Sequence, residues 1–146
     1  MEPRYKIPVS TLIIVHAQAR SVLLIERADF AGHWQSVTGS QEPGETLAET
    51  ATREVFEETG IDAARYGGVV DWRLCNVWEI FRKWGHRYPP GTTHNMEHVF
   101  GLDVAAEIPI VLAAAEHTAH IWLPPREAAA RCFSWSNREA IERLLR

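Results

Sequence analysis

The sequence has few cysteines, no long apolar run and no excess of basic residues. Its two cysteines, Cys75 and Cys132, are too few and too far apart to suggest a disulfide scaffold, and they favour a reducing cytoplasm. No apolar run reaches the roughly 18 residues that a membrane span requires, and no N-terminal signal pattern is visible. The formal net charge of −4 argues against a general nucleic-acid-binding protein and against binding to an anionic membrane surface.

Repeats, low-complexity segments and linkers are absent as well, so we expect a single domain over residues 1–146. A chain of 146 residues is long enough to bury a proper core. Its hydrophobic fraction of 46% and charged fraction of 23% are ordinary for a globular protein. The composition is therefore that of an ordinary single-domain globular protein, and no obligatory protein partner is evident.

The acidic segment Gly39–Ile61 is the most informative part of the chain. Thr46 and Glu49 have the spacing of a capping box, and Gly60 suits a left-handed C-cap, so we expect a helix between them. Its packing face is predicted to consist of Leu47, Ala48, Ala51 and Val55.

Glu54, Glu57 and Glu58 are predicted to lie on one side of the last turns of this helix. Each pair of like charges at such a spacing costs about 0.2–0.5 kcal/mol, and negative charge near the C-terminus also opposes the helix dipole. Arg53, four residues from both Glu49 and Glu57, would relieve part of this repulsion. Carboxylates without cysteine or histidine favour hard cations, so the cluster suggests Mg²⁺ or Mn²⁺, with a solvated acidic helix face as the ordinary alternative.

The residues before the helix complete a longer pattern. Gly39, Glu45 and the run 53–61 follow GX5EX7REUXEEXGU, where U is apolar, and every fixed position is filled. The segment therefore resembles the Nudix box of the Nudix hydrolases, which hydrolyse a nucleoside diphosphate linked to another group. The resemblance implies an α+β fold, a Nudix α/β/α sandwich with a mixed sheet and a loop–helix–loop box. It places metal ligands on Glu54, Glu57, Glu58 and the backbone carbonyl of Gly39.

The remainder of the chain reads as strands and helices without a steady βαβ alternation, which also favours an α+β fold. An opening hairpin is expected from two apolar runs, 9–15 and 22–26. Further strands are expected at 68–73, 77–84, 97–104, 108–112 and 120–123. An Ala-rich helix should end near Cys132. A second capping box, Ser136 with Glu139, should open a terminal helix whose Ile141, Leu144 and Leu145 face the core.

Stretches outside the box, notably WQSVTGS (34–40) and SWSNR (134–138), resemble one bacterial branch of the Nudix family. The resemblance implies Mg²⁺-dependent hydrolysis of 7,8-dihydroneopterin triphosphate, an early folate intermediate, to the monophosphate and pyrophosphate. It assigns the substrate pocket to Lys6, Arg27, Thr38, Trp78, Glu79, Ile80, Phe81 and Ser134. Trp78 and Phe81 would offer aromatic faces to the flat pterin, and Lys6 and Arg27 would meet phosphate oxygens. The alternatives are core packing for Trp78 and Phe81 and a solvated terminus for Lys6. For Arg27 the alternative is a surface strand end, and for Ser134 it is a turn residue before the terminal helix.

Glu116 lies in an expected loop between strands, and the resemblance adds it to the catalytic residues and metal ligands. Either Glu54 or Glu116 would accept the proton of the attacking water. His117 and His120 would lie on opposite faces of a strand, so a zinc pair is not expected.

Three other functions remain open at this stage. The nearest is a hydrolase of (deoxy)nucleoside triphosphates such as dATP, which would share the box and differ in the pocket. A hydrolase of dinucleoside polyphosphates or RNA 5′ ends is expected to have a more basic surface. A non-catalytic nucleotide-binding Nudix module would typically have lost box glutamates, and this chain has lost none.

Overall fold

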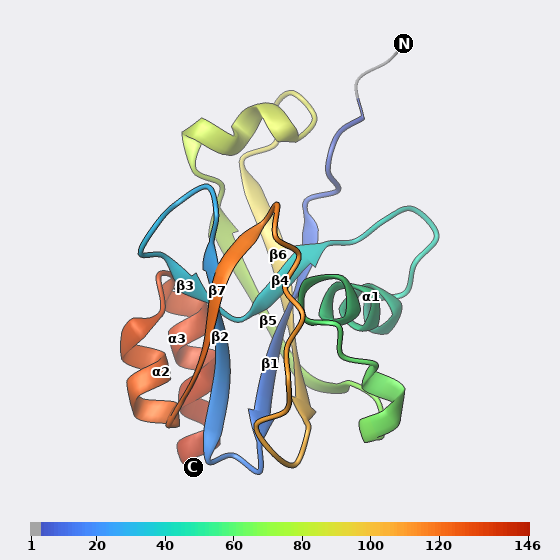
Figure 1. Ribbon diagram of the computed structural model, residues 1–146. Coiled ribbons are helices and arrows are strands. Elements are labelled where there is room, and N and C mark those ends of the chain that lie inside the picture. The colour runs from blue at the N-terminus through green and yellow to red at the C-terminus, as the bar shows by residue number, and fades with distance from the viewer. Residues whose placement is uncertain (1–3) are drawn as a thin grey trace.

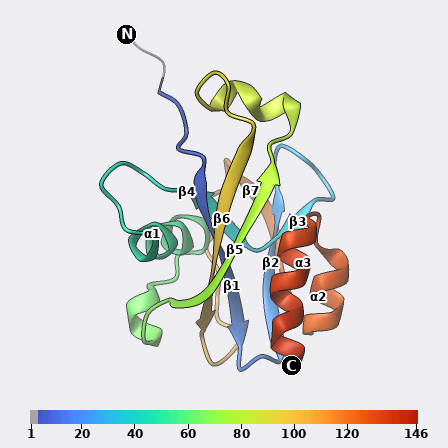
Figure 2. The same ribbon diagram turned by 180° about the vertical axis from the view of Figure 1, so that it is seen from behind.

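The fold is a mixed β-sheet held between helices, as the computed structural model shows for residues 4–146. Helix α1 (Leu47–Thr59) covers one side of the sheet, and α2 (Pro125–Arg131) and α3 (Trp135–Glu142) lie together on the other (Figures 1 and 2). The expected α+β sandwich is therefore confirmed. Residues 1–3 of the expected domain lie outside the described residues. Within residues 4–146, no helix has the length and apolarity needed to cross a membrane.

The sheet is organised around β1 (Val9–Ala17), which is buried along nearly its whole length. β1 pairs antiparallel with β2 (Ser21–Arg27) and β4 (Val37–Ser40), and parallel with β6 (His94–Asp103). β5 (Val70–Glu79) pairs with β6, while β3 (Trp34–Gln35) and β7 (His117–Leu123) pair with β2. Short 3-10 helices η1 (Ala63–Tyr66), η2 (Arg82–Arg87) and η3 (Arg143–Leu145) complete the fold.

Alternating side chains of the central strands pack into two hydrophobic cores, one on each side of the sheet. Ile13 and Val15 of β1 pack towards α1, where Ala51 and Val55 are fully buried. Leu12 and Ile14 point the opposite way, towards α2 and α3. A strand that is buried on both faces needs apolar residues at successive positions, which explains the run Leu12–Val15 in the middle of β1. The sheet is thereby fixed between the helices, and its edges position the functional side chains.

The expected hairpin at 9–15 and 22–26 and the α1 bounds are correct, but two expected strands, 68–73 and 77–84, are in fact one. β5 runs continuously across them because a bulge between Asp71 and Leu74 absorbs the irregularity, with Arg73 at φ 55°. It ends at Glu79, and the chain then turns into η2, where Phe81 and Trp84 pack edge to face at 5.3 Å. This aromatic packing is a tertiary contact that the alternation of the sequence does not encode.

The C-terminal helix begins two residues earlier than the expected capping box. Ser134, not Ser136, is the N-cap, and its hydroxyl accepts a hydrogen bond from Asn137 N at 3.2 Å. Ser136 is instead buried in the first turn. Ile141 and Leu144 pack on the core as expected, but Leu145 is 46% exposed because the helix tightens into η3 at its end.

Three further expectations need correction. Residues 108–112 form no strand, although Ile108, Ile110 and Leu112 pack against the α1 core. Ala48 is exposed and does not belong to the packing face of α1, because the buried stripe is narrower than the sequence pattern suggests. The short strand expected at 120–123 is longer and begins at His117, which brings that histidine into the sheet.

Candidate active site

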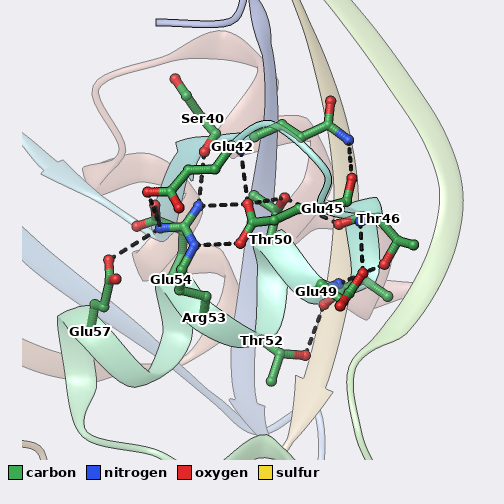
Figure 3. A network of polar contacts seen from close by, with 12 residues as sticks. Ser40, Glu42, Glu45, Thr46, Glu49, Thr50, Thr52, Arg53, Glu54 and Glu57 are labelled. Carbon is green, nitrogen blue, oxygen red and sulfur yellow. Dashed lines mark hydrogen bonds and ion pairs between the residues drawn. The ribbon is translucent and has the colours of Figure 1, made fainter. Parts of the chain in front are cut away.

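The ends of α1 are fixed by the local interactions that the sequence predicted. Thr46 and Glu49 form a reciprocal capping box, with hydrogen bonds of 2.9 and 3.1 Å (Figure 3). Gly60 is left-handed at φ 75°, and its N–H donates to the Phe56 carbonyl. These caps place Glu54, Glu57 and Glu58 in the last turns, with side chains that point away from the apolar core.

Arg53 ties α1 to the loop that precedes it. Its guanidinium binds both carboxylate oxygens of Glu45, at 2.7 and 3.0 Å, and donates to the Ser40 carbonyl at 3.0 Å (Figure 3). This hydrogen bonding lowers the pKa of Glu45 to about 2. Arg53 also pairs with Glu54 at 2.8 Å and Glu57 at 3.3 Å. Glu45 and Arg53 thus fix the position of the loop relative to the helix.

The expected pair between Arg53 and Glu49 does not form. Glu49 uses its carboxylate to close the capping box with the Thr46 N–H, so it points along the helix end and away from Arg53. Arg53 instead reaches across to the loop residue Glu45, which is eight positions earlier in the sequence.

Glu54 and Glu58 are buried carboxyl groups that lie close to each other. The Glu54 side chain is 12% exposed and that of Glu58 is 4% exposed. Burial raises the pKa of Glu54 to about 7, and it raises that of Glu58 well above its usual range, with Glu54 and Glu116 adding to the effect. Glu58 accepts a hydrogen bond from the Thr38 N–H at 3.2 Å. Glu57 differs, since its side chain is 53% exposed at the edge of the group.

Glu116 and His117 reach the same place from the start of β7. Ligand atoms of Glu58, Glu116 and His117 lie within 4.8 Å of one another. Burial, followed by the charge of Arg27, lowers the pKa of His117 to about 4, so its ring is neutral at neutral pH. His117 Nε2 lies 3.6 Å from Glu58 Oε1, and a neutral ring gives that carboxylate no countercharge.

The donor set fits a divalent cation. Buried carboxyl groups with raised pKa values and few cationic partners are costly unless a positive ion joins them. Their oxygen atoms suit a hard cation, and the neutral His117 could contribute a nitrogen. Gly39 completes this arrangement, because a β-carbon there would overlap the Glu54 carboxyl group. The Gly39 backbone can therefore approach the acidic group as no other residue could.

Two cavities meet beside this acidic group. The first, here called the acidic cavity, measures about 350 Å³ and is lined by Glu58, Glu116 and His117 with Asp29 and Ala115. The second, here called the aromatic cavity, measures about 390 Å³ and has walls from Trp78, Phe81, Trp84, Phe133 and Trp135. Four residues line both cavities: Arg27, Gln35, Thr38 and Arg87. An elongated ligand could thus place a flat ring in one cavity and an anionic tail in the other.

Most of the substrate residues expected from the sequence gather around the aromatic cavity. Those that line it are Arg27, Thr38, Trp78, Glu79, Phe81 and Ser134. Ile80 is buried and packs behind the wall, where its N–H donates to the Thr93 carbonyl. Lys6 does not line either cavity. Desolvation and the charge of Arg87 lower the pKa of Lys6, whereas the charges of Glu54 and Glu116 raise it. The Lys6 ammonium group therefore lies near enough to these two glutamates to interact with their charges.

Sequence reasoning missed several residues of the two cavities, including Trp84, Arg87, Glu97 and His117. Arg27, Lys83 and Arg87 all lie over the Trp84 ring, with the Arg27 guanidinium 4.8 Å and that of Arg87 5.9 Å from the ring centroid. Arg27 is also held by Asp29 through two hydrogen bonds of 2.8 Å. No periodicity marks these residues, because Trp84 and Arg87 of η2, Glu97 of β6 and His117 of β7 come together only in the folded chain.

Comparison with known proteins gives the same picture over nearly the whole chain. The family model described as the NUDIX domain matches residues 6–144. The chain is 46% identical over 143 residues to dihydroneopterin triphosphate diphosphatase of Escherichia coli K12, covering 97% of this chain and 94% of that protein. The enzyme of the same name from Haemophilus influenzae is 34% identical over 144 residues, or 97% and 90% of the two chains.

A solved structure, that of the E. coli dihydroneopterin triphosphate pyrophosphohydrolase, superimposes with a TM-score of 0.88 at 45% identity and covers 97% of each chain. The match thus extends well beyond the acidic helix to both cavities. The chain is a member of the Nudix hydrolase family.

Proposed function

We propose that this chain hydrolyses dihydroneopterin triphosphate to dihydroneopterin monophosphate and pyrophosphate. The observation that carries the proposal is the junction of the aromatic and acidic cavities at Arg27 and Arg87. The identity to relatives of that name over 97% of the chain supports the same substrate.

The aromatic cavity suits the pterin. Trp78 and Phe81 offer ring faces to a flat heterocycle, and Ser134 and Glu79 add polar groups at its wall. Arg27 and Arg87 line both cavities, so they would lie beside the part of the substrate that connects the pterin to the phosphates. Guanidinium groups bind phosphate oxygens through paired hydrogen bonds, so these two arginines would orient the triphosphate, with Lys6 adding charge near the acidic end.

Glu54, Glu57, Glu58, Glu116 and the Gly39 carbonyl are the groups that we propose as ligands for Mg²⁺, with Mn²⁺ as a substitute. A bound cation of this kind neutralises phosphate oxygens and lowers the pKa of a water molecule. Arg53 holds Glu54 and Glu57 in place through ion pairs of 2.8 and 3.3 Å. These ion pairs restrain two of the proposed ligands, while Glu58 and Glu116 have ligand atoms within 4.8 Å of each other.

Hydrolysis breaks the anhydride bond between the α- and β-phosphates, and water supplies the new P–O bond. Glu54, one of the carboxylates around the proposed cation, would accept the proton of that water. Glu116 is the alternative base, because its carboxylate is exposed at the wall of the acidic cavity.

Release of pyrophosphate from dihydroneopterin triphosphate, measured beside a panel of nucleoside triphosphates that includes dATP, tests the proposal. We expect the pterin to give the highest kcat/KM, and activity to require Mg²⁺ or Mn²⁺. A higher kcat/KM for dATP would favour a nucleotide hydrolase, and ligand binding without product would favour a non-catalytic module.

We also infer action in the cytoplasm without a nucleic-acid or obligatory protein partner. The two free cysteines support a reducing cytoplasm, and the net charge of −4 argues against a nucleic-acid partner. One chain provides the lining residues of both cavities, which supports action without a protein partner.

A further inference from the structure

Glu97 is a buried carboxyl group in the wall of the aromatic cavity, and the hydrolytic mechanism does not use it. It lies in the middle of β6, between Ser10 of β1 and Asn76 of β5, and is 5% exposed. A carboxylate is rarely buried to this extent without a charged partner. Among the described residues, no lysine, arginine or histidine forms an ion pair with it.

The hydrogen bonds of Glu97 leave one oxygen unused. Trp78 Nε1 donates to Oε2 at 3.3 Å. Burial raises the pKa of Glu97, while the side chains of Ser136, Trp78 and Asn76 favour its charged form. Within residues 4–146, no donor meets Oε1 with hydrogen-bond geometry, and Nδ2 of Asn76, opposite Glu97 on β5, is unpaired as well. Oε1 itself is buried, so a ligand reaches it only when the carboxyl group turns towards the cavity that Glu97 lines. Because buried acceptors are nearly always paired in folded proteins, this unused acceptor points to a donor on a ligand.

The pterin has the matching donors. Its pyrimidine ring carries the N3–H and the 2-amino group side by side on one edge, and a carboxylate can accept both. Trp78, whose indole N–H already holds Oε2, also forms part of the aromatic wall, so one residue would orient the carboxylate and flank the ring.

We propose that Glu97 binds the N3–H and 2-amino edge of the pterin and so selects 2-amino-4-oxo heterocycles in the aromatic cavity. This inference rests on the proposed function and adds to it the group that recognises the base. Glu97 is then a specificity-determining residue at the opposite end of the ligand from the cation-binding glutamates.

The wild-type protein offers a direct test with two small ligands that lack phosphate. Pterin carries the 2-amino group, and lumazine has an oxygen in its place, which would face the carboxylate with an acceptor. We expect pterin to bind about 10- to 100-fold more tightly than lumazine in calorimetric titrations. Equal affinities would overturn the inference without requiring any variant to fold.

The second experiment uses the Glu97→Gln variant. This substitution keeps the size of the side chain and an acceptor for Trp78, but it places an amide N–H₂ against the ligand's donors. We expect kcat/KM for dihydroneopterin triphosphate to fall about 10- to 100-fold, mainly through KM, with a change for dATP of less than about threefold. Glu139→Gln, the same change at an exposed position of α3, is the matched control and should leave both substrates unaffected.

The outcomes separate the inference from the proposed function. A wild-type enzyme that hydrolyses dATP better than the pterin substrate would defeat the proposed function itself. A wild-type enzyme that prefers the pterin, together with a Glu97→Gln variant that keeps this preference, would defeat only the role of Glu97. An equal loss on both substrates, with a lowered Tm, would assign Glu97 a structural role and would also overturn the inference.

Discussion

Gly39 and Glu54 lie so close together that a β-carbon at position 39 would overlap the Glu54 carboxyl group. Gly39 belongs to β4, where it pairs with Thr11 of the buried strand β1, so its backbone has little freedom to withdraw. Its φ angle is not in the left-handed region, so the requirement for glycine here is one of space. Strand β4 and helix α1 thus approach each other closely at the acidic group.

Gly39→Ala is therefore predicted to displace the Glu54 carboxyl group. We expect kcat/KM to fall about 100-fold, because a displacement of about 1 Å is enough to cost that much at a catalytic group. Pyrophosphate release is the measurement. Gly85→Ala serves as the control, since a β-carbon there meets open space, and it should retain activity within about twofold. Similar activities for the two variants would contradict the close approach.

Glu58→Gln is predicted to lower kcat by about 10²- to 10³-fold without unfolding the protein. The amide keeps the shape of the buried side chain but removes the charge that we propose to hold the cation. Its Tm should equal or exceed that of the wild type, because a buried amide costs less than an unpaired carboxylate. Glu57→Gln, at the exposed edge of the group, should lose less activity. Undiminished Mg²⁺-dependent turnover of Glu58→Gln would remove α1 from the mechanism.

Stabilisation by Mg²⁺ is predicted to increase with pH. Because the folded pKa of Glu54, about 7, exceeds its ordinary value of 4.5, the cation-free folded protein loses stability as pH rises between those values. A cation must displace the proton, so it binds weakly below this range and well above it. Thermal unfolding with and without Mg²⁺ should show a Tm increase of about 5 °C or more near pH 8 and a much smaller one near pH 5. A Tm increase that does not change with pH would refute the linkage.

Arg87→Ala is predicted to raise KM for dihydroneopterin triphosphate about 10- to 100-fold, because it removes a charged donor at the junction of the two cavities. Effects on kcat should be smaller if Arg87 binds the phosphates equally in the ground and transition states. Arg82→Ala, an exposed position in the same 3-10 helix that lines neither cavity, is the matched control. Equal KM values for the two variants would exclude Arg87 from substrate binding.

Glu45→Gln is predicted to weaken the protein at neutral pH but not in acid. The folded pKa of Glu45, about 2, lies below its ordinary value of 4.5, so its pair with Arg53 stabilises the fold above 4.5 and is lost as pH falls towards 2. Urea unfolding near pH 6 should show a loss of about 1 kcal/mol, and the difference from the wild type should shrink near pH 3. Glu42→Gln, which removes a longer and more exposed pair with Arg53, should change little at either pH. A pH-independent difference would argue against this linkage.

The acidic helix could be predicted from sequence because its determinants are local. Thr46 caps α1 through Glu49, and Gly60 ends it, all by contacts within four residues. The helical period then fixes Glu54 and Glu58 on the same face. The same reasoning failed at the C-terminus, where Ser134 and Ser136 both suit an N-cap. In the structure Ser134 is the N-cap. The side chain of Asn137 in the first turn of this helix is held by two buried hydrogen bonds to Ser36, of 2.8 and 3.0 Å.

Sequence alone therefore determined the local features on which we base the proposed chemistry: a capped helix, its glutamates and the loop that approaches them. Tertiary structure decided what surrounds that chemistry. Glu116 and His117 reach Glu58 only because β7 pairs with β2, and Arg27 and Arg87 meet only because η2 folds back over the sheet. Local spacing can encode contacts along one helix, but residues about sixty positions apart are brought together by the burial of the strands and helices that carry them.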